Sequence, residues 1–428
     1  MTQKVLFLTP GTGNFYCGSC LRDHGLAKAM IAEDWDVTML PLYLPHVAED
    51  QLGERPVFFG GLKVYLQQYV PGFQHLPKWM TSWMDHPSVL SFLARFSGMT
   101  SARTLGRMTL STLDLENSPQ LSSFEDMANW LEHELKPDAI VLSNALLLGF
   151  AGPLKKRLGC RVFCTLQGED TFLDSLSSEY RDRCWEVASQ QAQQVDRFMA
   201  VSHTHGTIMA KGLQLKDPNW TVIHNGIPIN NLPKPKSGPD IPTLGFLANI
   251  VPTKGLLSLV DAFIHMKKSR PEQALKLSIC GSVTPFTQNY LDEVKSRLVK
   301  AGVMKDCHFG INLSREEKFK ALQNMTLLSV PAVYGESFGL YVLEALAVGV
   351  PVVQPQHGAF PELIQETGGG LLYNHNDPTS YTEALWSIVD DPKQRNHLGR
   401  EGYETVHRKF SNAAMAHQVI NLLEKEND

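Results

Sequence analysis

Two glutamates, Glu336 and Glu344, are the residues whose type and spacing most directly suggest a chemical role. The apolar run before them, 326–330, predicts a buried strand, and 338–346 predicts a helix that ends before Gly349. An ionised carboxylate accepts hydrogen bonds but donates none, so each glutamate needs a partner rich in hydroxyl groups. The pair therefore suggests a ligand that carries hydroxyls at two separate places.

The start of the predicted helix adds a place for an anion between the two carboxylates. The first N–H groups of a helix have no partner within it, and the positive end of the helix dipole favours negative charge. A diphosphate is therefore expected near Phe338, Gly339 and Leu340. The distance from Glu336 to Glu344 would be about 12 Å along a helix, enough for a sugar on one side of the diphosphate and a ribose on the other. A sugar nucleotide fits this description.

Length and composition indicate a globular protein of two domains. The 428 residues exceed the usual size of one hydrophobic core, and 43% apolar with 19% charged residues exclude a disordered chain. The net charge of −5 argues against a nucleic-acid-binding protein. Seven scattered cysteines favour reduced thiols, the apolar run 5–8 is too short for a signal peptide, and no run reaches the length of a membrane span. We expect a cytoplasmic location.

The order of predicted elements indicates a doubly wound α/β fold in both halves of the chain. Strand 4–9, a helix over 21–32 and strand 36–41 form a βαβ unit. Further predicted strands are 139–142, 161–166, 197–201 and 221–223, and then 243–247, 275–280, 308–309, 351–354 and 369–373. The polar segment 230–242 carries four prolines and is the predicted domain junction.

Residues 73–130 fit this scheme least well. They include the aromatic and methionine side chains of Trp79, Met80, Trp83 and Met84, followed by basic residues. Helices that pack on the N-terminal domain are the favoured interpretation, because the apolar stripe of a helix usually faces a core. A weak peripheral contact with a membrane, through an amphipathic pair of helices, stays open as the alternative.

The glutamate pair belongs to an ordered set of motifs. The segment 352–363 (VVQPQHGAFPEL) follows it, and 222–227 (VIHNGI), 277–281 (LSICG) and Lys254 with Gly255 precede it. This set resembles the retaining GT-B glycosyltransferases, specifically glycosyltransferase family four. The resemblance implies a GT-B fold, in which two Rossmann-like doubly wound parallel-sheet domains face a central cleft.

The resemblance also implies how the chain is divided. Residues 1–235 would form the acceptor-side domain, and residues 236–410 the domain that binds the nucleotide sugar. In the family the last segment, here 411–428, is a helix that crosses back to the N-terminal domain.

Each residue that matches the family on the donor side takes a role from the resemblance. Glu336 would contact hydroxyls of the donor sugar, and Glu344 would contact the ribose diol. Lys254 would stabilise the diphosphate as it leaves, which makes Glu336 and Lys254 the expected catalytic residues. Gly18 would let the backbone of the N-terminal domain approach the phosphates. The remaining donor-side residues are Phe338, Gly339 and Leu340 at the diphosphate, and Gly281 and Ser282 near the base.

The implied reaction is transfer of a hexose from a nucleoside diphosphate sugar to an acceptor hydroxyl, with retention of anomeric configuration. UDP is the favoured nucleotide, with GDP and ADP as alternatives, and neither a metal nor a tightly bound cofactor is expected. Three other functions stay open. They are a sugar-nucleotide-binding protein of the same fold with weak or lost activity, a sugar-nucleotide epimerase, and a phosphorylase, which would need a lysine that bears pyridoxal.

The chain departs from the family pattern in two places. Asn249 stands where the family usually has arginine, so the diphosphate would lose one of two cations. Asn144 and Gln167 stand where the family often has histidine near the acceptor, and neither can act as a general base. Gln167, Glu169 and Asp170 are instead expected to hold an acceptor hydroxyl.

Two short motifs have the spacing of metal or redox sites. Cys17 and Cys20 form a C-x2-C pair, but no second pair with matching spacing follows, so small residues in a phosphate-binding turn are the favoured interpretation. His203 and His205 are also close in sequence. Without a third ligand nearby, we expect them on the surface or at the start of a helix.

Overall fold

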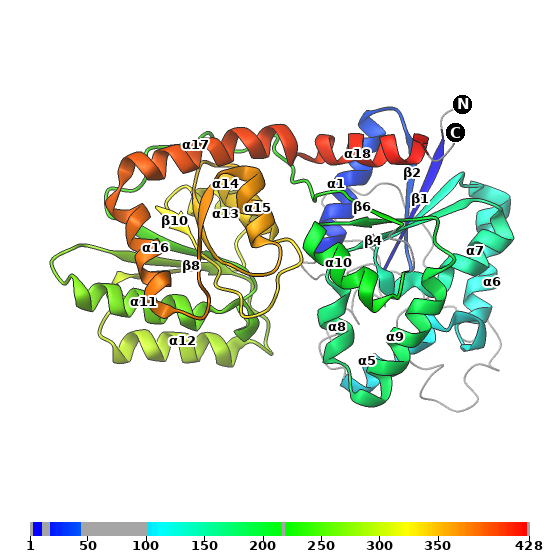
Figure 1. The fold of residues 1–428 in the computed structure, drawn as a ribbon, viewed down its shortest axis with the longest axis horizontal. Coiled ribbons are helices and arrows are strands. Elements are labelled where there is room, and N and C mark those ends of the chain that lie inside the picture. Colours follow the sequence, from blue (N-terminus) through cyan, green and yellow to red (C-terminus); the bar gives the residue numbers. More distant parts are fainter. Residues whose placement is uncertain (1–2, 11–17, 44–101, 216–218, 426–428) are drawn as a thin grey trace. The chain divides into compact units, whose positions relative to one another are not determined.

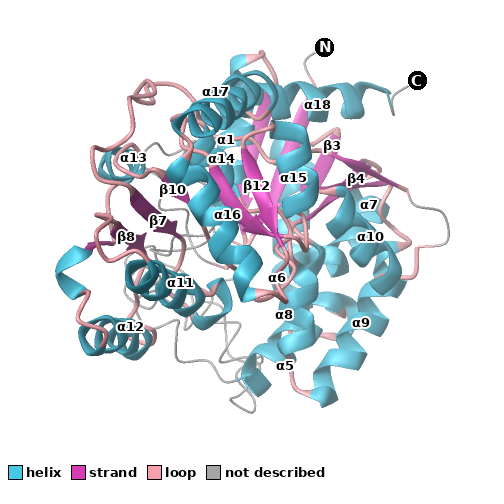
Figure 2. Ribbon diagram, turned by 60° about the vertical axis from the view of Figure 1, so that its left-hand side comes forward, coloured by secondary structure: helices cyan, strands magenta, loops and turns pink. Residues whose placement is uncertain are grey.

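The structure is a computed structural model that describes residues 3–10, 18–43, 102–215 and 219–425. It divides into two compact units. Unit 1 comprises Met1–His224 and Met415–Asp428, and unit 2 comprises Asn225–Ala414. Each unit contains a six-stranded parallel sheet flanked by helices (Figure 2). The predicted α/β fold with two Rossmann-like, doubly wound sheets is confirmed.

The sheet of unit 1 has a strand order that reverses next to its first strand. Its strands are β1 (Lys4–Thr9), β2 (Asp36–Pro41), β3 (Ala139–Leu142), β4 (Arg161–Leu166), β5 (Arg197–Ala200) and β6 (Trp220–Val222). They pair in the order β2-β1-β3-β4-β5-β6, and every pair is parallel. The chain builds from β1 to β2 on one side and from β3 to β6 on the other. A topological switch point therefore lies between β1 and β3.

Helices cover both faces of this sheet. They are α1 (Gly18–Ala32), α5 (Ala102–Leu113), α6 (Leu121–Trp130), α7 (Ala151–Leu158), α8 (Glu169–Ser175), α9 (Ser178–Ala192), α10 (His203–Gly212) and α18 (Asn412–Lys425), with short turns η4 (Leu115–Asn117), η5 (Leu131–Leu135) and η6 (Ala145–Phe150). Successive residues of a strand point to opposite faces. In β1, Val5 and Phe7 join the core under α1 and α18, whereas Leu6 and Leu8 join the core on the other face. The strands are continuously apolar because both faces are covered.

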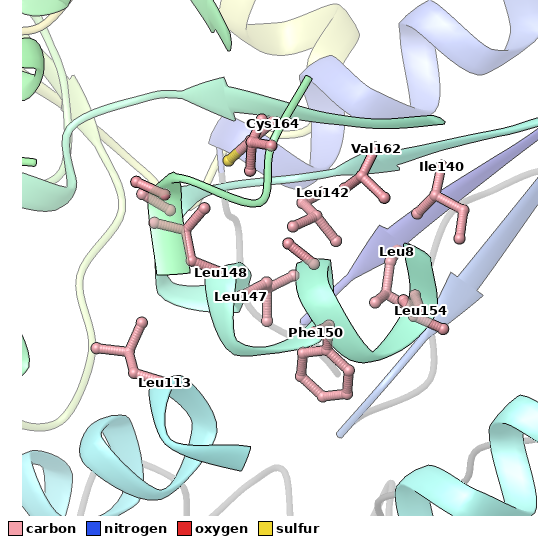
Figure 3. Close-up of a cluster of buried hydrophobic side chains, with 14 of the residues drawn as sticks. Leu8, Leu113, Ile140, Leu142, Leu147, Leu148, Phe150, Leu154, Val162 and Cys164 are labelled. Carbon is pink, nitrogen blue, oxygen red and sulfur yellow. The ribbon is translucent and has the colours of Figure 1, made fainter. Parts of the chain in front are cut away.

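The larger core of unit 1 lies on the face opposite α1 and α18. Figure 3 shows side chains of β1, β3 and β4, among them Leu8, Ile140 and Val162, gathered with Phe150 and Leu154 from η6 and α7. All five of these side chains are fully buried. This packing holds η6 and α7 against β1, β3 and β4.

Helices α5 and α6 also pack on this core, through Leu113, Phe124 and Met127. Packing on the domain, the favoured interpretation of residues 73–130, is therefore confirmed for the part of that segment from 102 onward. Residues 73–101 lie outside the described part of the chain. In the described ranges no helix is long and apolar enough to cross a lipid bilayer.

The sheet of unit 2 repeats the arrangement of unit 1. Its strands are β7 (Thr243–Leu247), β8 (Lys276–Gly281), β9 (Cys307–Ile311), β10 (Leu327–Leu328), β11 (Val352–Pro355) and β12 (Gly370–Tyr373). The order is β12-β11-β10-β7-β8-β9, again with every pair parallel. The strand order reverses between β10 and β7, which places the switch point of unit 2 there.

Helices also lie on both sides of the second sheet. They are α11 (Leu256–Ser269), α12 (Gln288–Lys300), α13 (Arg315–Leu322), α14 (Leu340–Leu346), α15 (Phe360–Thr367), α16 (Pro378–Asp390) and α17 (Pro392–Lys409), with short turns η7 (Pro252–Lys254) and η8 (Met304–Asp306). Figure 1 shows α11 and α12 on one side of the sheet and α14 and α17 on the other. These opposite sides follow from right-handed crossovers that leave the switch point in two directions.

The boundary between the units lies earlier than the sequence indicated. Unit 2 begins at Asn225, before the proline-rich segment 230–242. Hydrogen bonds explain the difference: Ile227 N donates to Phe410 O at 2.9 Å, and Asn412 N donates to Ile227 O at 3.1 Å. A stretch without regular structure can therefore still belong to a domain, because its backbone is bonded to that domain.

Candidate functional site

Several of the predicted donor-side residues lie close together at the switch point of unit 2. Strands β7 and β10 are neighbours in the sheet, so the segments that leave them lie side by side at the carboxyl ends. Ligands of open α/β sheets bind at this position. The segment after β7 supplies Asn249 and Lys254, and the segment after β10 supplies Glu336.

Lys254 and Glu336 form an ion pair at this point. Lys254 Nζ lies 2.5 Å from Glu336 Oε2, and the two side chains are 15% and 10% exposed. Lys254 also donates to the Tyr334 hydroxyl at 2.7 Å, and the Tyr341 hydroxyl donates to Glu336 Oε2 at 2.8 Å. Burial alone would lower the pKa of Lys254, but the Glu336 carboxylate and Tyr334 outweigh burial and raise that pKa. Lys254 is therefore a fixed positive charge at neutral pH.

A close approach between the backbones of the segments after β7 and β10 fixes the position of Lys254. The next residue, Gly255, has a φ of +71°, and a Cβ atom there would lie 1.8 Å from the Pro331 carbonyl oxygen. Val333 N, in the segment after β10, donates to Thr253 O at 3.0 Å. Only glycine allows the two segments to approach this closely. The Lys-Gly pair in the sequence therefore has a structural cause.

The loop that carries Glu336 is held by the segment after β11. Ala359 N donates to Glu336 O at 2.8 Å, and a Cβ atom at Gly358 would lie 2.5 Å from Glu336 N. Gly339, with a φ of +94°, then turns the chain into α14. The helix begins at Leu340 rather than at the predicted Phe338, so Phe338 and Gly339 belong to the loop before it.

Glu344 also pairs with a lysine. Lys318 Nζ, from α13, lies 2.6 Å from Glu344 Oε1, and the two side chains are 12% and 17% exposed. The sequence motif gave no sign of Lys318, which precedes Glu344 by 26 residues. Each carboxylate of the motif is thus neutralised by its own lysine.

Asn249, Gly281 and Ser282 meet at the carboxyl ends of β7 and β8. The Ser282 hydroxyl donates to Asn249 Oδ1 at 2.5 Å. A Cβ atom at Gly281 would lie 1.9 Å from Ala248 O, so a side chain at Gly281 would force the two segments apart. The structure therefore brings these three predicted donor-side residues together.

A buried polar network surrounds Glu169 in unit 1. Its Oε1 accepts from Ala145 N at 2.9 Å, and its Oε2 accepts from Gln167 N at 2.7 Å and Gly168 N at 2.9 Å. His205 Nε2 lies 3.3 Å from Oε2. Burial would raise the pKa of Glu169, but His205 and the backbone N–H groups outweigh burial and hold that pKa below its ordinary value of 4.5. The ionised side chain therefore ties the loops after β3 and β4 to α10.

This geometry corrects one predicted acceptor residue. Glu169 is 5% exposed and already accepts hydrogen bonds at both oxygens, so it has little capacity left for a ligand hydroxyl. Asn144 caps η6 and Gln167 donates to the Ser143 carbonyl at 2.6 Å. These two side chains and Asp170 remain partly exposed, and their contact with an acceptor stays a prediction.

The two short motifs are partly described by the structure. His203 and His205 both lie in the first turn of α10, so the expected position at the start of a helix is confirmed. His203 is exposed, whereas His205 is buried against Glu169. Cys20 is buried in α1, which begins at Gly18, and Cys17 lies outside the described residues. Within the described ranges no three His, Cys, Asp or Glu side chains gather as a metal site.

Both units match models of known glycosyltransferase domains. Residues 106–231 match the model described as Glycosyltransferase Family 4, and residues 230–405 match Glycosyl transferases group 1. Over residues 106–405 the chain thus matches the family 4, group 1 glycosyltransferases, one domain after the other. The ion pairs around Glu336 and Glu344 both fall in the segment that matches group 1.

Two relatives show how far the sequence similarity extends. The D-inositol 3-phosphate glycosyltransferase of Corynebacterium efficiens is 33% identical over 184 residues, which are 42% of each chain. The alpha-maltose-1-phosphate synthase of Mycolicibacterium smegmatis is 27% identical over 273 residues, 59% of this chain and 68% of that protein. The chain thus matches less than half the length of the first relative.

Solved glycosyltransferase structures share the fold over nearly the whole chain. Sucrose-phosphate synthase from Thermosynechococcus elongatus superimposes with a TM-score of 0.71 at 16% identity, covering 99% of this chain and 98% of that one. Anabaena HepE, solved in complex with UDP-glucose, gives a TM-score of 0.66 at 16% identity, covering 99% of both. The predicted GT-B fold is confirmed.

Alanine at Gly255 should destabilise the protein more than alanine at Gly302. The two glycines have φ values of +71° and +72°, but a Cβ atom at Gly302 meets nothing within 4 Å. Both substitutions carry the cost of a left-handed alanine, and the clash with Pro331 O adds about 1–3 kcal/mol at Gly255. Thermal unfolding of G255A and G302A measures the difference. Equal melting temperatures of G255A and G302A would show that the short distance between residue 255 and the Pro331 carbonyl does not restrict the side chain at position 255.

Replacing Glu169 by glutamine should reduce the amount of folding stability that the protein loses as pH falls. Because folding lowers the pKa of Glu169 below 4.5, the ionised side chain stabilises the fold above pH 4.5, and this contribution disappears as pH falls through the folded pKa. E169Q should therefore melt earlier than wild type at pH 7 and approach it at low pH. Glu317, an exposed carboxylate of the α13 capping box whose pKa is also lowered, supplies the control E317Q. If E169Q and E317Q lose equal stability at pH 7, the burial of Glu169 does not matter.

Proposed function

We propose that this chain is a retaining glycosyltransferase that moves a hexose from a nucleoside diphosphate sugar to an acceptor hydroxyl. The observation that carries the proposal is the Lys254–Glu336 ion pair at the switch point of the group 1 domain. An ammonium suits a diphosphate, and a carboxylate suits sugar hydroxyls. UDP is favoured over GDP and ADP because the related fold of HepE was solved with UDP-glucose.

Lys254 has the hydrogen-bonding capacity for the leaving group. Its ammonium has three N–H groups, of which one is directed at Glu336 and one at Tyr334. The third is assigned to a phosphate oxygen. When the glycosidic bond breaks, negative charge grows on the departing diphosphate, and a fixed cation beside it lowers the energy of the transition state.

The remaining donor contacts follow from the same segment. Glu336 would accept from hydroxyls of the transferred sugar, and Glu344, held by Lys318 at one oxygen, would accept from the ribose diol at the other. Helix α14 has seven residues, so its dipole is small. The backbone of residues 338–340 is therefore assigned a supporting contact with the diphosphate, and Lys254 supplies the main charge.

The acceptor is assigned to unit 1. Asn144, Gln167 and Asp170 lie at the carboxyl ends of β3 and β4, next to the switch point, and Gly18 begins the helix that follows β1. The amides of Asn144 and Gln167 cannot act as a general base, and the Asp170 carboxylate lies 3.7 Å from His205 Nδ1. The proton of the acceptor hydroxyl is therefore assigned to an oxygen of the departing phosphate, as in a retaining transfer without a nucleophilic side chain.

Asn249 supports a second candidate function. Its Oδ1 accepts from Ser282, so its amide can donate a hydrogen bond to a phosphate but brings no charge. A protein with one cation fewer at the diphosphate would bind a sugar nucleotide and transfer the sugar slowly or not at all. Binding without turnover is therefore the alternative.

A panel of nucleotides should show whether this protein binds a sugar nucleotide. We expect UDP and a UDP-hexose to raise the melting temperature more than GDP, ADP or their sugars do, because a ligand that binds the folded state stabilises it in proportion to its affinity. Thermal shift at matched concentrations makes this measurement. No shift with any of these nucleotides would contradict both the transferase and the binding-only proposals.

Removing the charge of Lys254 should slow the chemistry. K254M should lower the rate of sugar release from a UDP-hexose by about 100-fold to 1000-fold, the usual effect of losing one electrostatic contact to a developing charge. Lys267 provides a matched control, since it pairs with Asp306 at 2.7 Å with both side chains about equally shielded, 19% and 21% exposed. That pair lies before β9, at the amino ends of the strands.

K267M should therefore keep the wild-type rate. In the wild-type protein, the sugar anomer that is released first, identified by NMR, should have the same configuration as the donor. An unchanged rate in K254M would contradict the catalytic role of Lys254. Inversion of the anomer would contradict the retaining reaction while leaving sugar-nucleotide cleavage in place.

A further inference from the structure

The two oxygens of Glu336 differ in the hydrogen bonds they accept. Oε2 accepts from Lys254 at 2.5 Å and from the Tyr341 hydroxyl at 2.8 Å. The Tyr334 hydroxyl is shared between the two oxygens, at 3.3 Å from Oε1 and 3.4 Å from Oε2. Among the described residues, Oε1 thus has one long contact, while Oε2 has two short ones.

We propose that Tyr341 is a positioning residue that fixes the Glu336 carboxylate so that Oε1 receives a hydroxyl of the donor sugar. This inference rests on the proposed function and adds a residue to its site. A carboxylate oxygen has about two lone-pair directions, and those of Oε2 are taken by Lys254 and Tyr341. Oε1 keeps the capacity for a further strong hydrogen bond.

The fold holds the Tyr341 hydroxyl in place. Gly339 turns the chain just before α14, so the second residue of the helix returns to Glu336. Tyr341 is buried, with its ring centroid 6.4 Å from that of Phe360. Burial and the nearby carboxylate raise the pKa of the Tyr341 hydroxyl well above its ordinary value, so it stays a donor at every physiological pH.

Tyr341 also contacts the cation of the pair. The Lys254 ammonium lies 5.1 Å from the ring centroid of Tyr334 and 5.4 Å from that of Tyr341, within the range of cation–π attraction. Phenylalanine at 341 would keep this attraction and the packing against Phe360. It would remove the hydrogen bond to Oε2 alone.

Tyr381 provides a matched control in the same unit. It is also buried, its hydroxyl bonds Ser329 Oγ at 2.9 Å, and its ring stacks on Tyr373 with centroids 4.2 Å apart. Y381F removes a buried hydroxyl of the same kind without touching Glu336 or Lys254. Any general effect of losing such a hydroxyl would appear in both variants.

Binding calorimetry with UDP and with UDP-glucose, UDP-galactose and UDP-N-acetylglucosamine tests the proposal. Wild type should bind at least one UDP-hexose more tightly than UDP. Y341F should bind UDP within twofold of wild type but bind that UDP-hexose about tenfold more weakly, as expected for a lost hydrogen bond to a charged group. Y381F should match wild type for both ligands, because a positioning role of Tyr341 affects the sugar contact alone.

Equal weakening of UDP and UDP-hexose binding in Y341F would overturn the inference, since that pattern shows a general disturbance of the site. Wild-type affinities in Y341F would also overturn it, while leaving the transferase proposal intact. If wild type binds none of these ligands, the proposed function fails first, and the inference fails with it.

Discussion

The ion pair between Lys254 and Glu336 is the interaction on which the site of unit 2 depends. Removing two charges from water is costly, and the cost is offset when both charges are hydrogen-bonded, as Tyr334 and Tyr341 achieve here. The strand order brings the two charges together from segments far apart in the chain. Glycines with positive φ then allow the backbone contacts that keep them there.

The charges of the two pairs balance at the position proposed for the diphosphate. A carboxylate beside a phosphate would repel it, and the pair Glu336 and Glu344 places two carboxylates there. Lys254 pairs with Glu336, and Lys318 pairs with Glu344, so the two pairs together carry no net charge. This balance partly offsets the missing cation at Asn249. It also means that loss of either lysine leaves a carboxylate without its counter-charge.

The sequence predicted the parts of the site that depend on local pattern. The spacing of Glu336 and Glu344 and the glycine after Lys254 were readable, because each reflects a turn or a helix within one segment. The continuous apolar runs gave the parallel sheets for the same reason. Lys318 and the buried contact of His205 with Glu169 were not readable, because they depend on which strand ends become neighbours. The start of unit 2 at Asn225 is not evident from the sequence for a similar reason, since backbone hydrogen bonds leave no mark in composition.

The central claim is that the Lys254–Glu336 pair receives the donor. A crystal structure of the full chain with a bound UDP-hexose tests it most directly. The account predicts a phosphate oxygen within hydrogen-bond distance of Lys254 Nζ and a sugar hydroxyl on the Glu336 carboxylate, with the ribose diol at Glu344. A nucleotide bound away from the switch point of unit 2, or a diphosphate that does not touch Lys254, would contradict the account.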